Sequence, residues 1–224
     1  MKIAHKVKRF CQTSDTNCGP HALASLLSFY GNNTSPEKLE RATRMIPGIG
    51  TYDGWLGQTA LALGFKTRIT PQNLYVFDPT WNKLDAPGLL IKLRDFEANL
   101  NGNLKISLDG YAAFIESGGM IEFNTLSKDI LVEKLKKYPL FIGLCTTYLY
   151  GDLRPNDPAN NYRYGHFVVL DGYDSGSDKF WITDPWHSIS FSKDGHYQVK
   201  ADELVSAMYF AEATYDCTIM EIWQ

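Results

Sequence analysis

The chain has 224 residues and a net charge of −3, and 44% of its residues are hydrophobic. These values suit one globular domain with a sizeable core. The weakly acidic balance excludes a strongly basic nucleic-acid-binding protein, so we expect no nucleic-acid partner.

The N-terminal segment has no apolar stretch typical of a secretory signal, and no run of about 18 apolar residues predicts a membrane span. The four cysteines have no disulfide-like spacing, which is typical of a reducing compartment. We therefore expect a cytoplasmic protein, with export without a cleaved signal peptide as the alternative. Cys11, Cys145 and Cys217 lie in apolar or strand-like contexts, where packing is the expected role.

The first predicted elements are a short strand over residues 1–11 and a helix that begins at Cys18. Pro20 suits the first turn of a helix and Gly31 suits its end. The apolar positions recur at helical spacing; they are Ala22, Leu23, Leu26, Leu27 and Tyr30. The free N–H groups and the dipole at a helix N-terminus favour an anion, so Cys18 stands where a reactive thiolate is stabilised.

Gln12 lies six residues before Cys18, in the loop that leads into this helix. A thiolate nucleophile needs a base and donors for the oxyanion, and the Gln12 amide is suited to donate together with the Cys18 N–H. The alternative is that Cys18 is an inert core residue and Gln12 a polar surface residue. The spacing of Cys11, Cys18 and His21 matches no structural zinc pattern, so we expect no metal and no cofactor.

The rest of the chain predicts more helices, then strands. We expect helices over 35–46, 51–63, 127–138 and 202–209, and strands over 65–70, 140–145, 165–170, 179–184 and 217–223. Residues 71–126 read as an elaboration on the core, with a helix capped by Ser107. This order predicts an α+β fold in a single domain over 1–224, with N-terminal helices packed on a C-terminal antiparallel sheet.

Two polar residues mark the ends of neighbouring predicted strands. His166 begins an apolar strand, and Asp184 follows the next strand, just before Pro185. Adjacent antiparallel strands would bring them together, so that His166 takes the proton of Cys18 and Asp184 orients the imidazole. The other histidines, His5, His21, His187 and His196, are weaker candidates for the base.

Four features together resemble the bacteriocin-processing, or double-glycine leader, cysteine peptidases of family C39. They are Gln12 six residues before Cys18, the run Cys18-Gly19-Pro20, the run from Gly165 to Tyr173 around His166, and Thr183-Asp184-Pro185-Trp186. The resemblance covers residues 1–70 and 135–224. It implies a papain-like fold in which Cys18 is the nucleophile, His166 the base, Asp184 the orienting residue and Gln12 an oxyanion donor.

The chain also departs from this family. Leader peptidases of the family are usually domains of peptide-exporting transporters, whereas we expect a stand-alone member here. Residues 71–126 lengthen the separation of Cys18 and His166, and Asn17 stands where an acidic residue is common. The resemblance therefore predicts thiol chemistry on a peptide, and leaves a double-glycine substrate open.

Aromatic residues near His166 are candidates for substrate binding. Tyr148, Tyr150, Tyr162 and Tyr164 flank a polar segment over 151–161, and Trp186 follows Asp184. Loops between framework strands often carry specificity, and tyrosines contribute both ring packing and a hydroxyl. The alternatives are sheet-edge aromatics for the tyrosines and a core position for Trp186.

Three functions fit these residues. The first is a cysteine peptidase that hydrolyses a peptide bond through an acyl-enzyme. The second is a thiol-based acyltransferase, transpeptidase or deamidase that uses the same triad. The third is a non-catalytic peptide-binding module, which is disfavoured because Gln12, Cys18, His166 and Asp184 are all present.

Overall fold

The computed structural model describes residues 1–46, 48–97, 101–151, 164–214 and 216–224. The helices are α1 (Cys18–Ser28), α2 (Pro36–Ala42), α3 (Asp53–Ala62), α4 (Ala86–Glu97), α5 (Gly102–Glu116), α6 (Lys128–Leu135), α7 (Thr146–Tyr150) and α8 (Ala201–Phe210), with 3₁₀ turns η1 (Pro79–Lys83) and η3 (Ala211–Thr214). The strands are β1 (Lys2–Ala4), β2 (Lys66–Pro71), β3 (Met120–Ile121), β4 (Leu140–Cys145), β5 (Gly165–Asp174), β6 (Lys179–Thr183), β7 (His196–Lys200) and β8 (Thr218–Trp223).

The strands form a mixed sheet in the order β3-β2-β8-β4-β5-β6-β7, and β1 pairs with β5. Only β2 and β3 run parallel among these pairs; the other pairs are antiparallel. The α+β class expected from the sequence is confirmed. The sheet is wider than expected, because β1, β2 and β3 from the first part of the chain join it.

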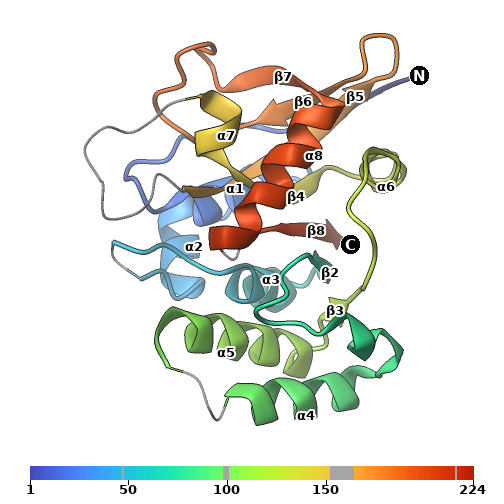
Figure 1. Cartoon of the computed structure of the whole chain (residues 1–224). Coiled ribbons are helices and arrows are strands. Elements are labelled where there is room, and N and C mark those ends of the chain that lie inside the picture. The colour runs from blue at the N-terminus through green and yellow to red at the C-terminus, as the bar shows by residue number, and fades with distance from the viewer. Residues whose placement is uncertain (47, 98–100, 152–163, 215) are drawn as a thin grey trace.

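Helices cover both faces of the sheet, because side chains alternate along its central strands. Phe167 and Val169 of β5 face a core shared with α1, α3, α4 and α5. Val168 and Leu170 face a second core shared with α6 and α8. In Figure 1, β5–β7 lie at one end of the molecule, whereas α4 and α5 lie at the other.

The elaboration over 71–126 packs on the core through its helix α5. A side chain at Gly54 of α3 would lie 2.5 Å from the backbone of Gly110, so the two glycines let these helices touch. The Tyr111 hydroxyl donates to Asp53 at 2.6 Å beside this contact. Helix α5 begins at Gly102 and not at Ser107, which is buried inside the helix and does not cap it, so the expected cap was wrong.

Two other local expectations also differ from the structure. Residues 146–150 form the short helix α7, whereas Tyr148 and Tyr150 were expected either in a loop or at a sheet edge. Gly151 ends the helix with a positive φ of 64°. Residues 196–200 form β7, a strand that is absent from those expected from the sequence, and Tyr197 and Val199 point inward while their polar neighbours point outward.

Candidate active site

Cys18 is the first residue of α1, and a hydrogen-bond network holds the loop before it. Asn17 accepts from the Ser14 N–H at 3.1 Å and donates to Glu40 of α2 at 2.7 Å. His21 contacts the same Glu40 carboxylate at 3.2 Å, which gives this histidine a buried structural role. The thiol therefore stands at a helix N-terminus whose position is fixed from α2.

His166 and Asp184 lie in contact on neighbouring strands. Val169 of β5 pairs with Thr183 of β6, so Asp184, one residue later, lies near the beginning of β5. His166 Nε2 is 2.8 Å from Asp184 Oδ1, and both side chains are buried. Because Nε2 is engaged by the carboxylate, Nδ1 is the nitrogen left for Cys18.

The charges of this group act on one another. Burial lowers the pKa of His166, but the Asp184 carboxylate, by its charge and its hydrogen bond, and then Cys18, by a hydrogen bond and its charge, raise it to about 10. Burial raises the pKa of Asp184, and the charge and hydrogen bond of His166 hold it below its usual range. These interactions therefore favour the cationic form of the His166 imidazole.

Two tyrosines and a tryptophan surround this pair. The Tyr150 and Tyr197 hydroxyls both donate to Asp184 Oδ2, the second at 2.6 Å. The backbone N–H of Trp186 donates to Asp184 Oδ1 at 2.8 Å, and the Trp186 ring meets the imidazole edge-on, with centroids 6.1 Å apart. Tyr150 was expected to contact substrate, but its hydroxyl donates a hydrogen bond to Asp184 instead.

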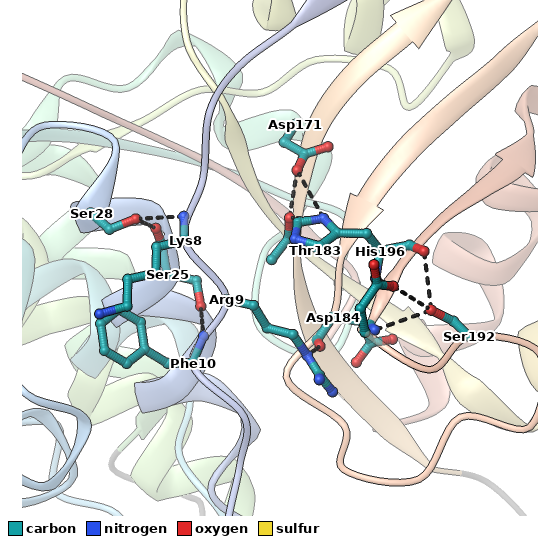
Figure 2. Close-up of polar contacts among 12 residues, drawn as sticks. Lys8, Arg9, Phe10, Ser25, Ser28, Asp171, Thr183, Asp184, Ser192 and His196 are labelled. Carbon is teal, nitrogen blue, oxygen red and sulfur yellow. Dashed lines mark hydrogen bonds and ion pairs between the residues drawn. The ribbon is translucent and has the colours of Figure 1, made fainter.

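An N-terminal segment connects the Cys18 helix to the Asp184 loop (Figure 2). The Phe10 N–H donates to Ser25 of α1 at 3.0 Å, while Arg9 Nε donates to the Asp184 carbonyl at 2.6 Å. Arg9 Nη2 also donates to the Trp186 carbonyl. This segment therefore fixes both halves of the site relative to each other.

Gln12 is buried between the same two halves, which excludes the surface role considered for it. Its backbone N–H donates to the Pro185 carbonyl at 2.7 Å, directly after Asp184. Its side-chain Nε2 donates one hydrogen bond to the Ser14 carbonyl at 2.7 Å. That bond uses one of the two amide protons and leaves the other for a different acceptor.

The remaining aromatic candidates lie at different places. Tyr148 is exposed on α7 and packs against Phe210 at a centroid distance of 5.0 Å. Tyr164 directly precedes β5, and its carbonyl accepts from the Thr146 N–H at 2.9 Å. Tyr162 lies outside the described residues. Of the other cysteines, Cys145 and Cys217 are buried, but Cys11 is exposed, so its expected packing role was wrong.

Asp216 is a further residue beside the site that the sequence did not single out. Its carboxylate lies over Gly165, where a Cβ would come within 1.5 Å of Oδ2. Its backbone carbonyl lies over Gly143 of β4. Burial and the charge of Asp53 raise the pKa of Asp216 to about 7, although Thr214 and His166 lower it. In the sequence, a glycine directly before His166 was the feature that could have indicated this close approach of another segment.

In the described part of the chain, no three or more His, Cys, Asp or Glu side chains are grouped to hold a metal ion. Nor does any described helix combine the length and apolar character needed to cross a membrane.

The model of the Peptidase_C39 like family matches residues 4–210. The chain belongs to this family. It is accordingly a cysteine-type peptidase, and the resemblance expected from its motifs is confirmed. A search of curated proteins gives no significant match.

Solved structures that match this chain at low sequence identity include one peptidase domain and two other proteases. The peptidase domain of Streptococcus ComA, a bifunctional ABC transporter involved in quorum sensing, is 16% identical, with 98% of both chains covered and a TM-score of 0.49. A double-glycine motif protease from an AMS/PCAT transporter, in complex with the leader peptide, is 14% identical, with 100% and 98% covered and a TM-score of 0.48. Xylellain, a cysteine protease from Xylella fastidiosa, is 16% identical, with 99% and 84% covered and a TM-score of 0.45.

Proposed function

We propose that Cys18, His166 and Asp184 are the catalytic triad of this cysteine peptidase and that its substrate is a peptide or protein. The observation that carries the proposal is that Asp184 hydrogen-bonds the buried imidazole of His166 while Cys18, by a hydrogen bond and its charge, raises the pKa of the same ring. Asp184 engages Nε2, which leaves Nδ1 to exchange a proton with the thiol. The Tyr150 and Tyr197 donors keep the carboxylate ionised and fixed.

The reaction then runs in two halves. His166 Nδ1 holds the proton of Cys18, and the thiolate attacks the carbonyl carbon of the scissile bond. The tetrahedral intermediate collapses as His166 gives this proton to the leaving amine, and an acyl-enzyme thioester remains. His166 next takes a proton from a water molecule, and the resulting hydroxide attacks the thioester and releases the carboxylic acid and the Cys18 thiolate, which restores the starting thiolate–imidazolium pair.

The backbone N–H of Cys18 and the Gln12 amide are proposed to stabilise the oxyanion. The buried position of Gln12 and its tie to Pro185 support this role, since a fixed donor needs no reorganisation during reaction. The remaining amide proton of Gln12 is the one available to the oxyanion.

A peptide library derived from a whole proteome tests the proposal. We expect the wild-type protein to create new peptide termini, detected by mass spectrometry, and Cys18→Ala to create none. Isopeptide-linked products or one-dalton mass shifts, without new termini, would instead identify acyl transfer or deamidation on the same triad. Cleavage that persists in Cys18→Ala would remove the triad from the mechanism.

A further inference from the structure

The turn Asp184-Pro185-Trp186 holds two groups against the His166 ring. Asp184 Oδ1 lies 2.8 Å from His166 Nε2 and also accepts the backbone N–H of Trp186 at 2.8 Å. The Trp186 ring meets the imidazole edge-on. A shift of this turn would therefore move the carboxylate and the indole away from the imidazole together. The contacts that fix the turn thus also fix the orientation of His166.

Arg9, in the segment before α1, binds both ends of this turn. Its Nε donates to the Asp184 carbonyl at 2.6 Å, and its Nη2 donates to the Trp186 carbonyl. One planar guanidinium group therefore sets the separation of two carbonyls that lie two residues apart in the chain. A lysine ammonium carries its donors at a single point and lacks this fork, so the arrangement depends on arginine. In Figure 2, the Arg9 side chain reaches from the segment beside α1 towards Asp184.

A glycine on the other half of the site makes room for the guanidinium. Gly195 directly precedes β7 and has a φ of +73°. A Cβ at this position would come within 2.1 Å of Arg9 Nε and 2.4 Å of Arg9 Cζ, so the arginine side chain would have to move away. The Gly195 carbonyl also accepts from the Asp184 N–H at 2.9 Å. Both backbone polar groups of Asp184 are thus engaged, one by Gly195 and the other by Arg9.

The backbone on either side of Arg9 is bound to α1, the helix that carries the proposed nucleophile. The Lys8 N–H donates to Ser28 Oγ at 2.9 Å, and the Phe10 N–H donates to Ser25 Oγ at 3.0 Å. The main chain at Arg9 is therefore fixed to one half of the site, while its side chain reaches the other half. A change in the Arg9 side chain alone would leave the first attachment intact and release the second.

We propose that Arg9 is a positioning residue for the peptidase reaction. Its guanidinium holds the turn over 184–186 so that Asp184 and the Trp186 ring face His166, and Gly195 keeps the space for it open. Arg9 acts through these residues and not on the substrate. The inference rests on the function proposed above, because the turn that it fixes carries a member of the proposed triad.

Two substitutions disturb these hydrogen bonds from opposite sides. Arg9→Ala removes the guanidinium, and Gly195→Ala puts a methyl group where the guanidinium lies. We expect each to lower kcat by about 10²-fold with little change in KM, because a small misplacement of catalytic groups costs about this much.

Each substitution has a matched control. Lys8→Met changes the neighbouring cation, which lies over the Phe10 ring. Gly31→Ala introduces the same backbone strain as Gly195→Ala, since its φ is +74°, but nothing lies within 4 Å of its Cβ. We expect both controls to keep a kcat close to that of the wild type. Near-normal kcat in Arg9→Ala, or equal losses in Gly195→Ala and Gly31→Ala, would overturn the inference.

Added guanidinium distinguishes lost hydrogen bonds from a damaged fold. In Arg9→Ala, we expect millimolar methylguanidinium to recover about tenfold in kcat, because its planar fork can donate to both carbonyls. Methylammonium, which has no fork, should recover little, and Arg9→Lys should remain below the wild type for the same reason. No recovery with methylguanidinium, or equal recovery with both salts, would overturn the role of Arg9.

An NMR titration of the His166 ring separates this inference from the proposed function, since it needs no substrate. Burial lowers the pKa of His166, but the charge and hydrogen bond of Asp184 contribute to raising it to about 10. We expect this pKa to fall in Arg9→Ala and to stay unchanged in Lys8→Met. If it falls although the wild type cleaves no peptide, the proposed function alone fails. If peptides are cleaved but neither kcat nor this pKa changes in Arg9→Ala, the role of Arg9 alone is wrong.

Discussion

Asp184 sets the charge of His166, and its removal tests this directly. In the wild type we expect the His166 imidazole to titrate near pH 10, because the charge and hydrogen bond of Asp184 outweigh burial. In Asp184→Asn, burial is no longer offset by a carboxylate, so the pKa of His166 falls well below its wild-type value. NMR of the ring protons follows both titrations. Equal values in the two proteins would contradict this coupling.

The same pair makes stability depend on pH. The folded pKa of His166 lies above the unfolded value of about 6.5, so its contribution is complete below about pH 6.5 and is lost as pH rises towards 10. We expect the free energy of unfolding to decline over this range in the wild type, as measured by urea titration. Asp184→Asn should lack this part of the decline.

Gln12 is a test of the oxyanion site. We expect Gln12→Ala to lower kcat by about 10²–10³, the loss typical of a single oxyanion donor. Because Gln12 also holds the Ser14 carbonyl, the rate of Cys18 alkylation in this variant is the control. Unchanged alkylation with lowered kcat separates the donor role from a displaced loop, and near-normal kcat would remove Gln12 from the mechanism.

At the scale of elements, Gly165 lets the segment before β8 cross the sheet beside His166. A methyl group there would lie 1.5 Å from Asp216 Oδ2 and 2.4 Å from Thr214 Oγ1. We expect Gly165→Ala to lower the melting temperature and to reduce kcat, because either Asp216 or the start of β5 must shift. Gly176→Ala is the matched control, since its nearest contact is 3.3 Å and its turn is exposed. Equal losses of melting temperature and kcat in Gly165→Ala and Gly176→Ala would show that the close approach of Asp216 to Gly165 is not the cause.

The sequence predicts a helix or strand well when neighbouring residues determine it, and poorly when contacts between distant residues do. Strand β4 and the core of β5 follow from apolar runs, and α1 from its helical spacing and its Pro20 start. The bounds of α5 do not, because its buried face is defined by a contact between Gly54 and Gly110, far apart in the chain. Strand β7 was missed although Tyr197 and Val199 alternate with polar residues, so that signal was available.

The same distinction holds for the site. The sequence brings His166 and Asp184 together because they end neighbouring strands, and the structure places them 2.8 Å apart. It gives no sign that the Tyr150 hydroxyl donates to Asp184, since 34 residues separate them and the bond depends on how α7 packs. For Asp216 it offers only a partial signal in Gly165, because the position of Asp216 also depends on Gly143 in a neighbouring strand.

At the scale of the whole molecule, a buried ionic network ties the elaboration to the core. Lys134 of α6 lies 2.5 Å from Glu221 of β8 and also contacts Glu122, which follows β3. Arg68 of β2 adds a longer contact to Glu221 at 3.6 Å. Because Glu221 is only 1% exposed, its charge depends on these partners. We propose that residues 1–224 therefore unfold as one domain.

Replacing Lys134 tests this connection. Lys134→Met leaves the Glu221 carboxylate buried with one distant cation, so we expect a loss of about 3–5 kcal/mol in the free energy of unfolding. Lys137→Met, at an exposed position on the same segment, is the control and should change little. Chemical denaturation followed by fluorescence and circular dichroism should give one coincident transition. Two separate transitions in the wild type would contradict a single domain.

The central claim is that Cys18 and His166 form an activated thiolate–imidazolium pair. Its most direct test is the rate of iodoacetamide labelling at each cysteine against pH, read by mass spectrometry, in the wild type and in His166→Ala. Cys11 is exposed and has no proposed catalytic partner, so it is the internal control for accessibility alone. Cys18 is half-buried, so faster labelling there cannot be explained by greater exposure. We expect Cys18 to react faster than Cys11 at pH 6 in the wild type and to lose this advantage in His166→Ala. Labelling of Cys18 that is slower than that of Cys11 at pH 6, and the same in both proteins, would contradict the account.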